Sequence, residues 1–285
     1  DGEYVLTAKV TGLEPGTRYY YRLLSRGVAE SEPAAGPTGT FVTLGARGTA
    51  RELSFAVVTG MNAFAFRVRS SAEKKELGYP ALESIVSENP DFLVATGDNV
   101  YYDTPYIFRA KSRGSMRAKW HRQFATPRFA AFFQRVPVYW QKDDHDYRYN
   151  DADPYGPLEP SHQLGVGVFL EQVPVAPPDQ KEIVTYRTHR IGDLLQIWLL
   201  EGRDYRDSNI EPPSPGKTMW GAEQKEWLER TLLASDAVFK ILISPTPLIG
   251  PDDKLTGIQG GILARLVGSS PIGQGGDNRK RDNHT

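Results

Sequence analysis

Residues 136–151 read Val-Pro-Val-Tyr-Trp-Gln-Lys-Asp-Asp-His-Asp-Tyr-Arg-Tyr-Asn-Asp, an apolar strand-like segment followed at 143–146 by three carboxylates and one imidazole. Such a run cannot be buried without compensation, because its like charges repel one another. A bound divalent or trivalent metal would compensate them, since hard cations take carboxylate oxygen and histidine is a common nitrogen ligand. The alternative is a solvated acidic loop, and this stretch alone does not choose between the two.

A second stretch of the same design lies upstream. Residues 92–96 form a buried-type strand that runs directly into Gly97-Asp98-Asn99, and a third apolar run, 53–58, ends in Thr59-Gly60-Met61-Asn62. In open α/β sheets, ligands bind outside the carboxyl ends of the strands, and Gly97 would let the backbone turn so that Asp98 points there. We therefore expect shared metal ligation at these strand ends. A bimetal site there could polarise a phosphoryl oxygen and activate water.

Composition restricts the classes of protein and of metal site. The 285 residues are 39% hydrophobic and 24% charged, which indicates one large or two smaller globular domains rather than disorder. The net charge of −1 argues against a nucleic-acid protein that relies on a strongly basic surface. Because the chain has no cysteine, a metal must be held by oxygen and nitrogen ligands. No apolar run has the length of a membrane span, and oligomeric state stays open.

The pattern of expected elements changes near residue 50. Residues 1–47 contain strand-like runs only at 4–10, 18–24 and 38–44, too few for a sandwich that buries both its faces. From residue 52 onward, strand and helix patterns alternate, which favours an α/β layered domain. Helices are expected at 79–88, 114–135 with a break near Pro127, 162–172 and 220–233. Further strands are expected at 183–190, 194–200 and 237–244, and the Gly-rich segment 250–276 is expected to be a surface loop.

Three motifs in this chain resemble one known family. They are Pro-Asp-Phe-Leu-Val-Ala-Thr-Gly-Asp-Asn-Val-Tyr-Tyr at 90–102, Trp-Gln-Lys-Asp-Asp-His-Asp at 140–146, and Thr-Met-Trp-Gly-Ala-Glu-Gln-Lys-Glu-Trp-Leu at 218–228. Together they resemble PhoD-like alkaline phosphatases and phosphodiesterases of the calcineurin-like metallophosphoesterase superfamily. The resemblance implies an α/β fold with a β-sandwich flanked by helices (αββα). It also implies hydrolysis of small phosphate mono- or diesters, iron and calcium as the metal ions, and a secreted or periplasmic location.

The N-terminal residues, 1–47, resemble a different module. The pattern Leu13-x-Pro15-x-Thr17-x-Tyr19 resembles the corner between two late strands of fibronectin type III domains, where the tyrosine hydroxyl bonds to nearby backbone. We expect the C-terminal part of such a domain, which matches the family's usual N-terminal domain. The metallophosphoesterase domain, 52–285, is expected to be truncated at its C-terminus, because the family's final Gly-Asp-x-His motif lies beyond Thr285.

The resemblance assigns metal ligands by position. Asp98 would bridge the metals, and Tyr101 would coordinate iron as a phenolate. Asp144 or Asn150 would bind the second metal, supported by the flanking aspartates of the 143–146 run. Without the resemblance, Tyr101 would be a strand-end aromatic that packs on neighbouring tyrosines.

Further residues are assigned to catalysis. His145 would stabilise the transition state or protonate the leaving group, a role suited to an imidazole near neutral pH. Arg203 and Arg206 would hold phosphate oxygens, for which a guanidinium fork is well shaped. Alternatively, Arg203 merely pairs with Asp204 or Glu201.

One position departs from the family pattern at the end of the first expected strand of this domain. The family's first strand usually ends in Ser-Cys-Gln, with the cysteine as an iron ligand, whereas this chain has Gly60 there. Asn62 is the nearest polar substitute and is therefore a candidate metal ligand.

The leading hypothesis is metal-dependent hydrolysis, in which a metal-bound hydroxide attacks phosphorus in line and His145 assists the leaving group. The alternative is a catalytically inert binding or interaction protein on the same scaffold, which the loss of the cysteine ligand favours. A serine hydrolase is the weakest alternative, since no Gly-x-Ser-x-Gly elbow occurs in the sequence.

Overall fold

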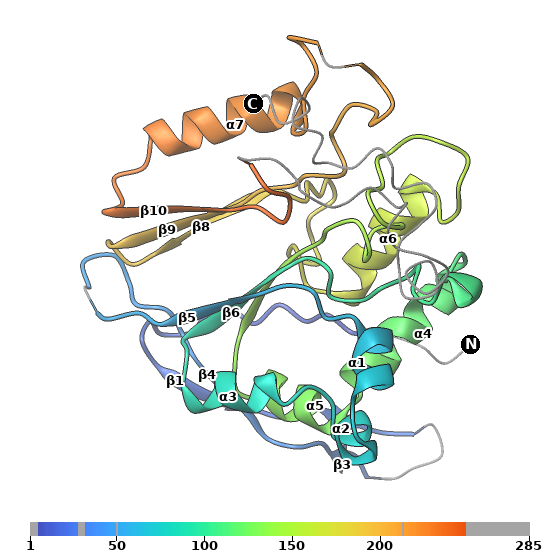
Figure 1. Ribbon diagram of the computed structural model, residues 1–285. Helices are drawn as coiled ribbons and strands as arrows, with labels where there is room; N and C mark the ends of the chain where they lie inside the picture. The colour runs from blue at the N-terminus through green and yellow to red at the C-terminus, as the bar shows by residue number, and fades with distance from the viewer. Residues whose placement is uncertain (1–4, 28–31, 50, 213, 249–285) are drawn as a thin grey trace.

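Two three-stranded sheets form the centre of the computed structural model, which describes residues 5–27, 32–49, 51–212 and 214–248 (Figure 1). The first sheet is parallel, in the order β5 (Phe55–Val58), β6 (Phe92–Thr96) and β7 (Val138–Gln141). The second has the order β10 (Phe239–Ile243), β9 (Leu195–Leu199) and β8 (Arg187–Ile191). In it β10 runs parallel to β9, whereas β8 and β9 are antiparallel.

The two sheets pack face to face, and β6 shows why its sequence is apolar throughout. Phe92 and Val94 face the second sheet and pack with Ile197 of β9, whereas Leu93 and Ala95 face the helices on the other side. All five residues of β6 are buried, because a strand covered on both faces has no solvent side. The described strands and helices therefore form a layered αββα arrangement.

Helices cover the outer face of each sheet (Figure 1). The outer face of β9 packs through Trp198 on α7, where Leu228 is buried. The other helices lie on the side of the first sheet, and their largest buried side chains are Trp120, Phe129 and Phe169. The helix bounds are α1 (Ala63–Arg69), α2 (Ala72–Leu77), α3 (Ala81–Ser87), η1 (Tyr106–Phe108), α4 (Arg113–Phe124), α5 (Pro127–Phe133), α6 (His162–Gln172) and α7 (Gly221–Leu233).

The expected break near Pro127 is confirmed. Helix α4 ends at Phe124, and Pro127 is the first residue of α5, where its missing N–H costs no intrahelical hydrogen bond. Helices α1 and α2 were not expected from the sequence. Each is shorter than two full turns and begins at a side-chain cap, Asn62 for α1 and Ser71 for α2.

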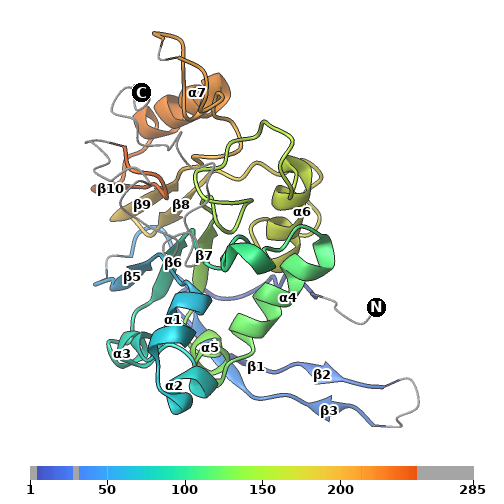
Figure 2. The same cartoon turned by 45° about the vertical axis from the view of Figure 1, so that its right-hand side comes forward.

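The N-terminal residues form two small antiparallel pairs, β1 (Arg18–Tyr21) with β4 (Gly39–Val42) and β2 (Leu24–Ser25) with β3 (Ala34–Ala35). The β2–β3 pair extends away from the rest of the chain (Figure 2). The hydroxyl of Tyr19 accepts a hydrogen bond of 2.8 Å from the backbone N–H of Glu14, which is the bond expected of the strand corner. The strand expected at 4–10 is wrong for the described residues 5–10, which have no ladder partner and are exposed.

Two hydrogen bonds join these strands to the end of α5. The N–H of Thr40 donates to the carbonyl of Gln134 at 2.7 Å, and the hydroxyl of Tyr21 donates to the carbonyl of Phe133 at 3.3 Å. The likeness of residues 1–47 to a fibronectin type III domain stays a prediction. The glycine-rich segment 250–276 and the ending 280–285 lie outside the described residues. Within the described residues, no helix has the length and apolarity that a membrane crossing requires.

His189 of β8 makes the fold sensitive to acid. Its ring packs on Tyr139, with centroids 4.4 Å apart, and its buried Nε2 atom has no hydrogen-bond partner among the described residues. Burial, with a smaller contribution from Arg187, lowers the pKa of His189 to about 4. The unfolded chain therefore binds the proton first on acidification, and the free energy of unfolding should fall as pH drops from about 6.5 towards 4.

We expect His189→Phe to remove this part of the acid sensitivity, because phenylalanine keeps the ring packing and cannot be protonated. Between pH 7 and pH 4 the free energy of unfolding of the wild-type protein should fall by up to about 3 kcal/mol more than that of the variant. Urea unfolding of both proteins across this range measures the difference. Parallel loss of stability in the two proteins would contradict the assignment.

Candidate metal centre

The carboxyl ends of β5, β6 and β7 meet at one edge of the first sheet, as expected from their parallel order. Gly97 and Asp98 follow β6 with φ angles of 91° and 55°, both in the left-handed region. A Cβ atom on residue 97 would lie 2.5 Å from the backbone nitrogen of Asp143, so only glycine allows the two loops to approach so closely. The N–H of Met61 donates to the carbonyl of Asp98 at 2.9 Å and ties the end of β5 to the same turn.

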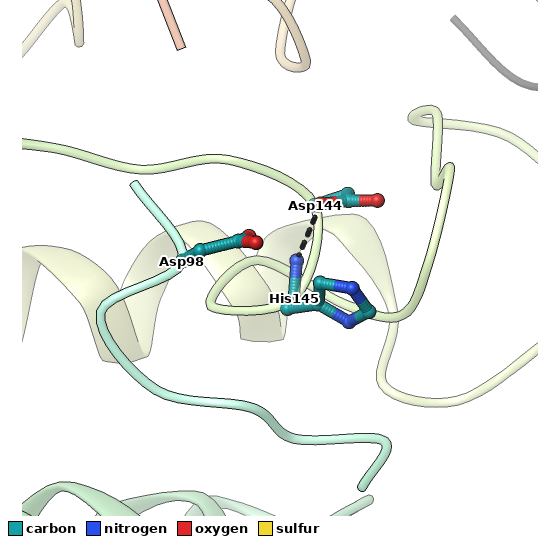
Figure 3. A group of neighbouring side chains, drawn as sticks. All are labelled: Asp98, Asp144 and His145. Carbon is teal, nitrogen blue, oxygen red and sulfur yellow. Dashed lines mark hydrogen bonds between the residues drawn. The ribbon is translucent and has the colours of Figure 1, made fainter. Parts of the chain in front are cut away.

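Asp98, Asp144 and His145 bring their ligand atoms together at this edge (Figure 3). One such atom from each residue lies within 4.8 Å of the other two. Burial, followed by the charge of Asp144, raises the pKa of Asp98 well above its usual value. The Oδ1 atom of Asp98 is buried and accepts no hydrogen bond from the described residues. The strand ends thus form a buried cluster of negative charge with an unused ligand atom.

Tyr101 adds a phenol to this cluster. Its hydroxyl donates to Oδ2 of Asp98 at 2.6 Å, and its ring stacks on the imidazole of His145 with centroids 4.1 Å apart. Burial and the charge of Asp98 raise the pKa of the Tyr101 phenol above its usual value. Coordination of an ion by this oxygen would therefore release a proton.

Asp103 orients His145, and sequence reasoning missed it. Its Oδ1 lies 2.8 Å from Nδ1 of His145, and its Oδ2 accepts the N–H of Asn150 at 2.9 Å. Burial lowers the pKa of His145, but the charges of Asp144 and Asp103 outweigh that effect, so the net pKa lies well above the usual range. The signal was present in the sequence: Asp103 ends the same polar cluster as Asp98, and a functional imidazole commonly has an orienting carboxylate.

Asp146 is completely buried and joins the loop after β6 to the loop after β7. Its Oδ2 accepts hydrogen bonds from the backbone and side-chain nitrogens of Asn99, and its Oδ1 accepts the N–H of Asp143 at 2.7 Å. The side chain of Asn99 also donates to the carbonyl of Gln141 at the end of β7. Asp146 and Asn99 thus fix the distance between the loops after β6 and β7.

Arg203 is buried beside the acidic run. Its Nε donates to Asp143 at 2.7 Å, and its Nη2 lies 3.8 Å from a carboxylate oxygen of Asp144. Glu201 and Asp204, the acids considered as alternative partners, both bind Lys142, with N···O distances of 2.8 Å and 2.6 Å. Glu201 also accepts the backbone N–H of Arg203 at 2.7 Å. Arg203 therefore anchors the acidic run in this structure, and phosphate binding by its guanidinium stays a prediction.

Two other predicted residues, Arg206 and Asn150, have different surroundings. Arg206 is buried, with Nη1 3.5 Å from the carbonyl oxygen of Gly202. The side chain of Asn150 donates to Asp151 at 2.6 Å, and the N–H of Asp151 in turn donates to Oδ2 of Asp144. The roles of Arg206 and Asn150 in phosphate and metal binding stay predictions.

Asn62 and Gly60 sit at the end of β5. The Oδ1 atom of Asn62 accepts the N–H of Ala65 at 2.9 Å and so caps α1. This bond explains why asparagine stands there, although a second lone pair would still be available for a ligand. Gly60 has a φ of 78°, and no described atom lies within 4 Å of a Cβ placed on it. Space exists for a longer side chain at residue 60, but the backbone conformation favours glycine.

The donor set fits a hard cation. Two carboxylates, an imidazole and a phenol supply only oxygen and nitrogen atoms, and Oδ1 of Asp98 has no hydrogen-bond partner among the described residues. A positive ion would offset the repulsion between Asp98 and Asp144 and would take up the lone pairs of that oxygen.

Comparisons with known proteins find phosphatases of the PhoD type. A family model described as PhoD-like phosphatase matches residues 64–259. The curated relative alkaline phosphatase D of Bacillus subtilis (strain 168) is 27% identical over an alignment of 266 residues, and the match covers 81% of this chain and 42% of the relative. The chain therefore spans less than half the length of this relative.

Two solved structures share the fold. The structure of PhoD matches with a TM-score of 0.60 and 24% identity, over 81% of this chain and 48% of that one. The purple acid phosphatase PPD1 from yellow lupin (Lupinus luteus) seeds matches with a TM-score of 0.57 and 16% identity, over 85% of this chain and 38% of that one. At these identities the two structures show the likeness of the folds alone.

Proposed function

The chain belongs to the PhoD-like phosphatase family, and from that premise we propose that it hydrolyses phosphate mono- or diesters at a metal centre held by Asp98 and Asp144. One observation carries the proposal: the carboxylate of Asp98 has a buried oxygen with no hydrogen-bond partner among the described residues, and it lies within 4.8 Å of ligand atoms of a second carboxylate and an imidazole. A structural core would pair or neutralise these groups, whereas a metal centre requires them.

Each residue has a proposed role in the reaction. A bound ion would polarise the phosphoryl oxygen and lower the pKa of an attacking water. Asp98 holds the ion from the turn after β6, and Tyr101 is its second candidate ligand on that turn. Asp103 accepts the hydrogen bond of the His145 Nδ1–H group, which leaves Nε2 to donate a proton to the departing alkoxide. Iron and calcium are the proposed ions.

Hydrolysis of bis(4-nitrophenyl) phosphate tests the proposed function. We expect turnover that is lost after dialysis against a chelator and regained when iron or calcium is added. Inertness of the metal-loaded protein towards this diester and towards 4-nitrophenyl phosphate would contradict the proposal. That outcome would favour a binding protein on a phosphatase scaffold, the alternative that the glycine at residue 60 supports.

The role of His145 can be separated from metal binding. We expect His145→Gln to lower kcat for a phosphate ester of an aliphatic alcohol by about 10²–10⁴-fold, because that leaving group requires a proton. The loss should be less than about tenfold for a 4-nitrophenyl ester, whose anion leaves readily without a proton. Both rates are measured on protein of verified metal content. Equal losses for the two esters would make His145 a metal ligand rather than the proton donor.

A further inference from the structure

A pocket of about 360 Å³ lies next to the candidate metal centre, between α1, α4 and the loop at 100–108. We propose that this pocket, called the aryl pocket below, binds the organic group of the phosphate ester and favours an aromatic group that carries its own negative charge. This inference rests on the proposed hydrolytic function and adds the class of substrate. The volume lies in the range of small-molecule sites.

Tyr101 forms the wall between the metal centre and the aryl pocket. Its ring lines the pocket, while its hydroxyl binds Asp98 and its face stacks on His145. An ester whose phosphate is held at Asp98 would therefore direct its organic group along this ring and into the pocket. The wall is held in place, because the ammonium of Lys119 donates to the carbonyls of Tyr101 and Thr104 at 2.8 and 2.6 Å.

The pocket has aromatic walls. Phe66 stacks on Tyr79 with centroids 4.3 Å apart, and Tyr79 packs edge-on against the buried ring of Phe129. On the other side, Phe108 lines the pocket although 74% of its surface is exposed. An exposed phenylalanine beside a preformed aromatic wall is suited to cover a planar group, with a gain from offset or edge-on ring contacts.

The charges around the pocket have one sign. Arg67 of α1, Lys75 of α2, and Lys119 and Arg122 of α4 line it, and no carboxylate of the described residues does so. Arg67, Lys75 and Arg122 are exposed and can swing towards a bound anion. An uncharged alkyl chain would gain no electrostatic attraction from these cations, and a quaternary ammonium group would be repelled by them. An aromatic anion uses both the rings and the charges, and cations also bind well over its ring faces.

Phosphonates test the pocket without turnover, because a P–C bond replaces the ester bond. The series is methyl-, octyl-, phenyl-, 4-carboxyphenyl- and 4-(trimethylammonio)phenylphosphonate, and binding to the metal-loaded protein is measured by calorimetry. We expect phenylphosphonate to bind about tenfold more tightly than methylphosphonate, and the carboxyphenyl compound several-fold more tightly again. The trimethylammonio compound should bind more weakly than phenylphosphonate.

Matched variants locate the effect in the molecule. Phe108→Ala should reduce the advantage of phenyl over methyl to about twofold, whereas Ile107→Ala, at an exposed neighbour that does not line the aryl pocket, should not. Arg67→Gln should remove most of the advantage of carboxyphenyl over phenyl, whereas Arg69→Gln in the same turn of α1 should not.

The possible outcomes separate the two proposals. Equal affinities across the series, or ratios unchanged in Phe108→Ala and Arg67→Gln, overturn the aryl pocket. Tighter binding of an octylphosphonate or of the trimethylammonio compound than of the carboxyphenyl compound overturns it as well. Methylphosphonate reports on the metal centre alone, because it has no group to fill the pocket. A protein that binds the aryl compounds as expected but hydrolyses no ester would contradict the proposed hydrolysis and leave the ligand preference of the pocket established.

Discussion

Asp98→Asn is expected to lower kcat/KM for phosphate-ester hydrolysis about a thousandfold or more, which corresponds to the several kcal/mol that a metal ion contributes to catalysis. Asparagine keeps the backbone conformation, since it tolerates the φ of 55° at this position. It also keeps an oxygen that can accept the hydrogen bond of Tyr101. The variant thus removes the negative charge with little other change.

The same substitution should make the metal-free protein more stable. Burial and Asp144 raise the pKa of Asp98, so its ionised form destabilises the folded state at neutral pH. A carboxyl group whose pKa is higher in the folded than in the unfolded protein lowers the free energy of unfolding as the pH rises. The loss begins near the pKa of the unfolded protein and continues up to the pKa of the folded protein. The neutral amide avoids this loss, and urea unfolding in the presence of chelator should give a higher free energy of unfolding at pH 7.

A surface aspartate provides the control for both effects. Asp236 is exposed, pairs with Arg190 and Arg47, and precedes β10 of the second sheet, whereas the metal centre lies at the end of the first sheet. Asp236→Asn should leave turnover unchanged and alter stability little, because ion pairs between exposed side chains contribute little to folding. Retention of activity by Asp98→Asn within tenfold of wild type would remove Asp98 from the metal centre.

Lys142→Met is expected to destabilise the fold by about 3–5 kcal/mol, because it leaves two buried carboxylates without a counter-ion. Lys142 is fully buried between Glu201 and Asp204, and its ammonium lies 4.6 Å from the ring centre of Tyr147. Burial alone would lower the pKa of Lys142, but the charges of Asp204 and Glu201 raise it above its usual value. The lysine is therefore charged in the folded protein.

Neutral partners provide the control for Lys142. The triple variant Lys142→Met, Glu201→Gln, Asp204→Asn contains no buried charge at this place and should recover at least half of the lost free energy of unfolding. Recovery of that kind separates loss of a counter-ion from loss of packing. Chemical unfolding in urea measures all variants. A stability of Lys142→Met within 1 kcal/mol of wild type would show that the carboxylates do not need this cation.

Much of the fold could be predicted from the sequence, because the strands have strong local signals. Strand β6 is a continuous apolar run, and it is buried on both faces. The break at Pro127 follows from the chemistry of proline, and the short helices α1 and α2 escaped notice because six or seven residues give too few turns for a clear period. The strand expected at 4–10 shows the opposite error: alternation of residue types does not make a strand where no partner strand pairs with it.

The meeting of Asp98 with Asp144 and His145 was also predictable, since parallel strands place their carboxyl ends at one edge. The partners of the charged residues could not be predicted from the sequence. The guanidinium of Arg203 binds Asp143, sixty positions away in the chain, whereas the carboxylate of its sequence neighbour Glu201 binds Lys142 and the backbone N–H of Arg203. Such pairs depend on how the loop after β9 packs on the loop after β7, and sequence spacing does not contain that geometry. The capping bond of Asn62 likewise depends on a helix that the sequence did not reveal.

The metal content of the protein decides whether Asp98 and Asp144 hold the ion. Wild type, Asp98→Asn and Asp236→Asn would be stripped with chelator, incubated with iron and calcium, freed of unbound ions and subjected to elemental analysis. We expect at least one ion per chain in the wild type and in Asp236→Asn, and loss of at least one equivalent in Asp98→Asn. The same metal content in Asp98→Asn as in the wild type, or no stoichiometric metal in any of the three, would contradict this expectation.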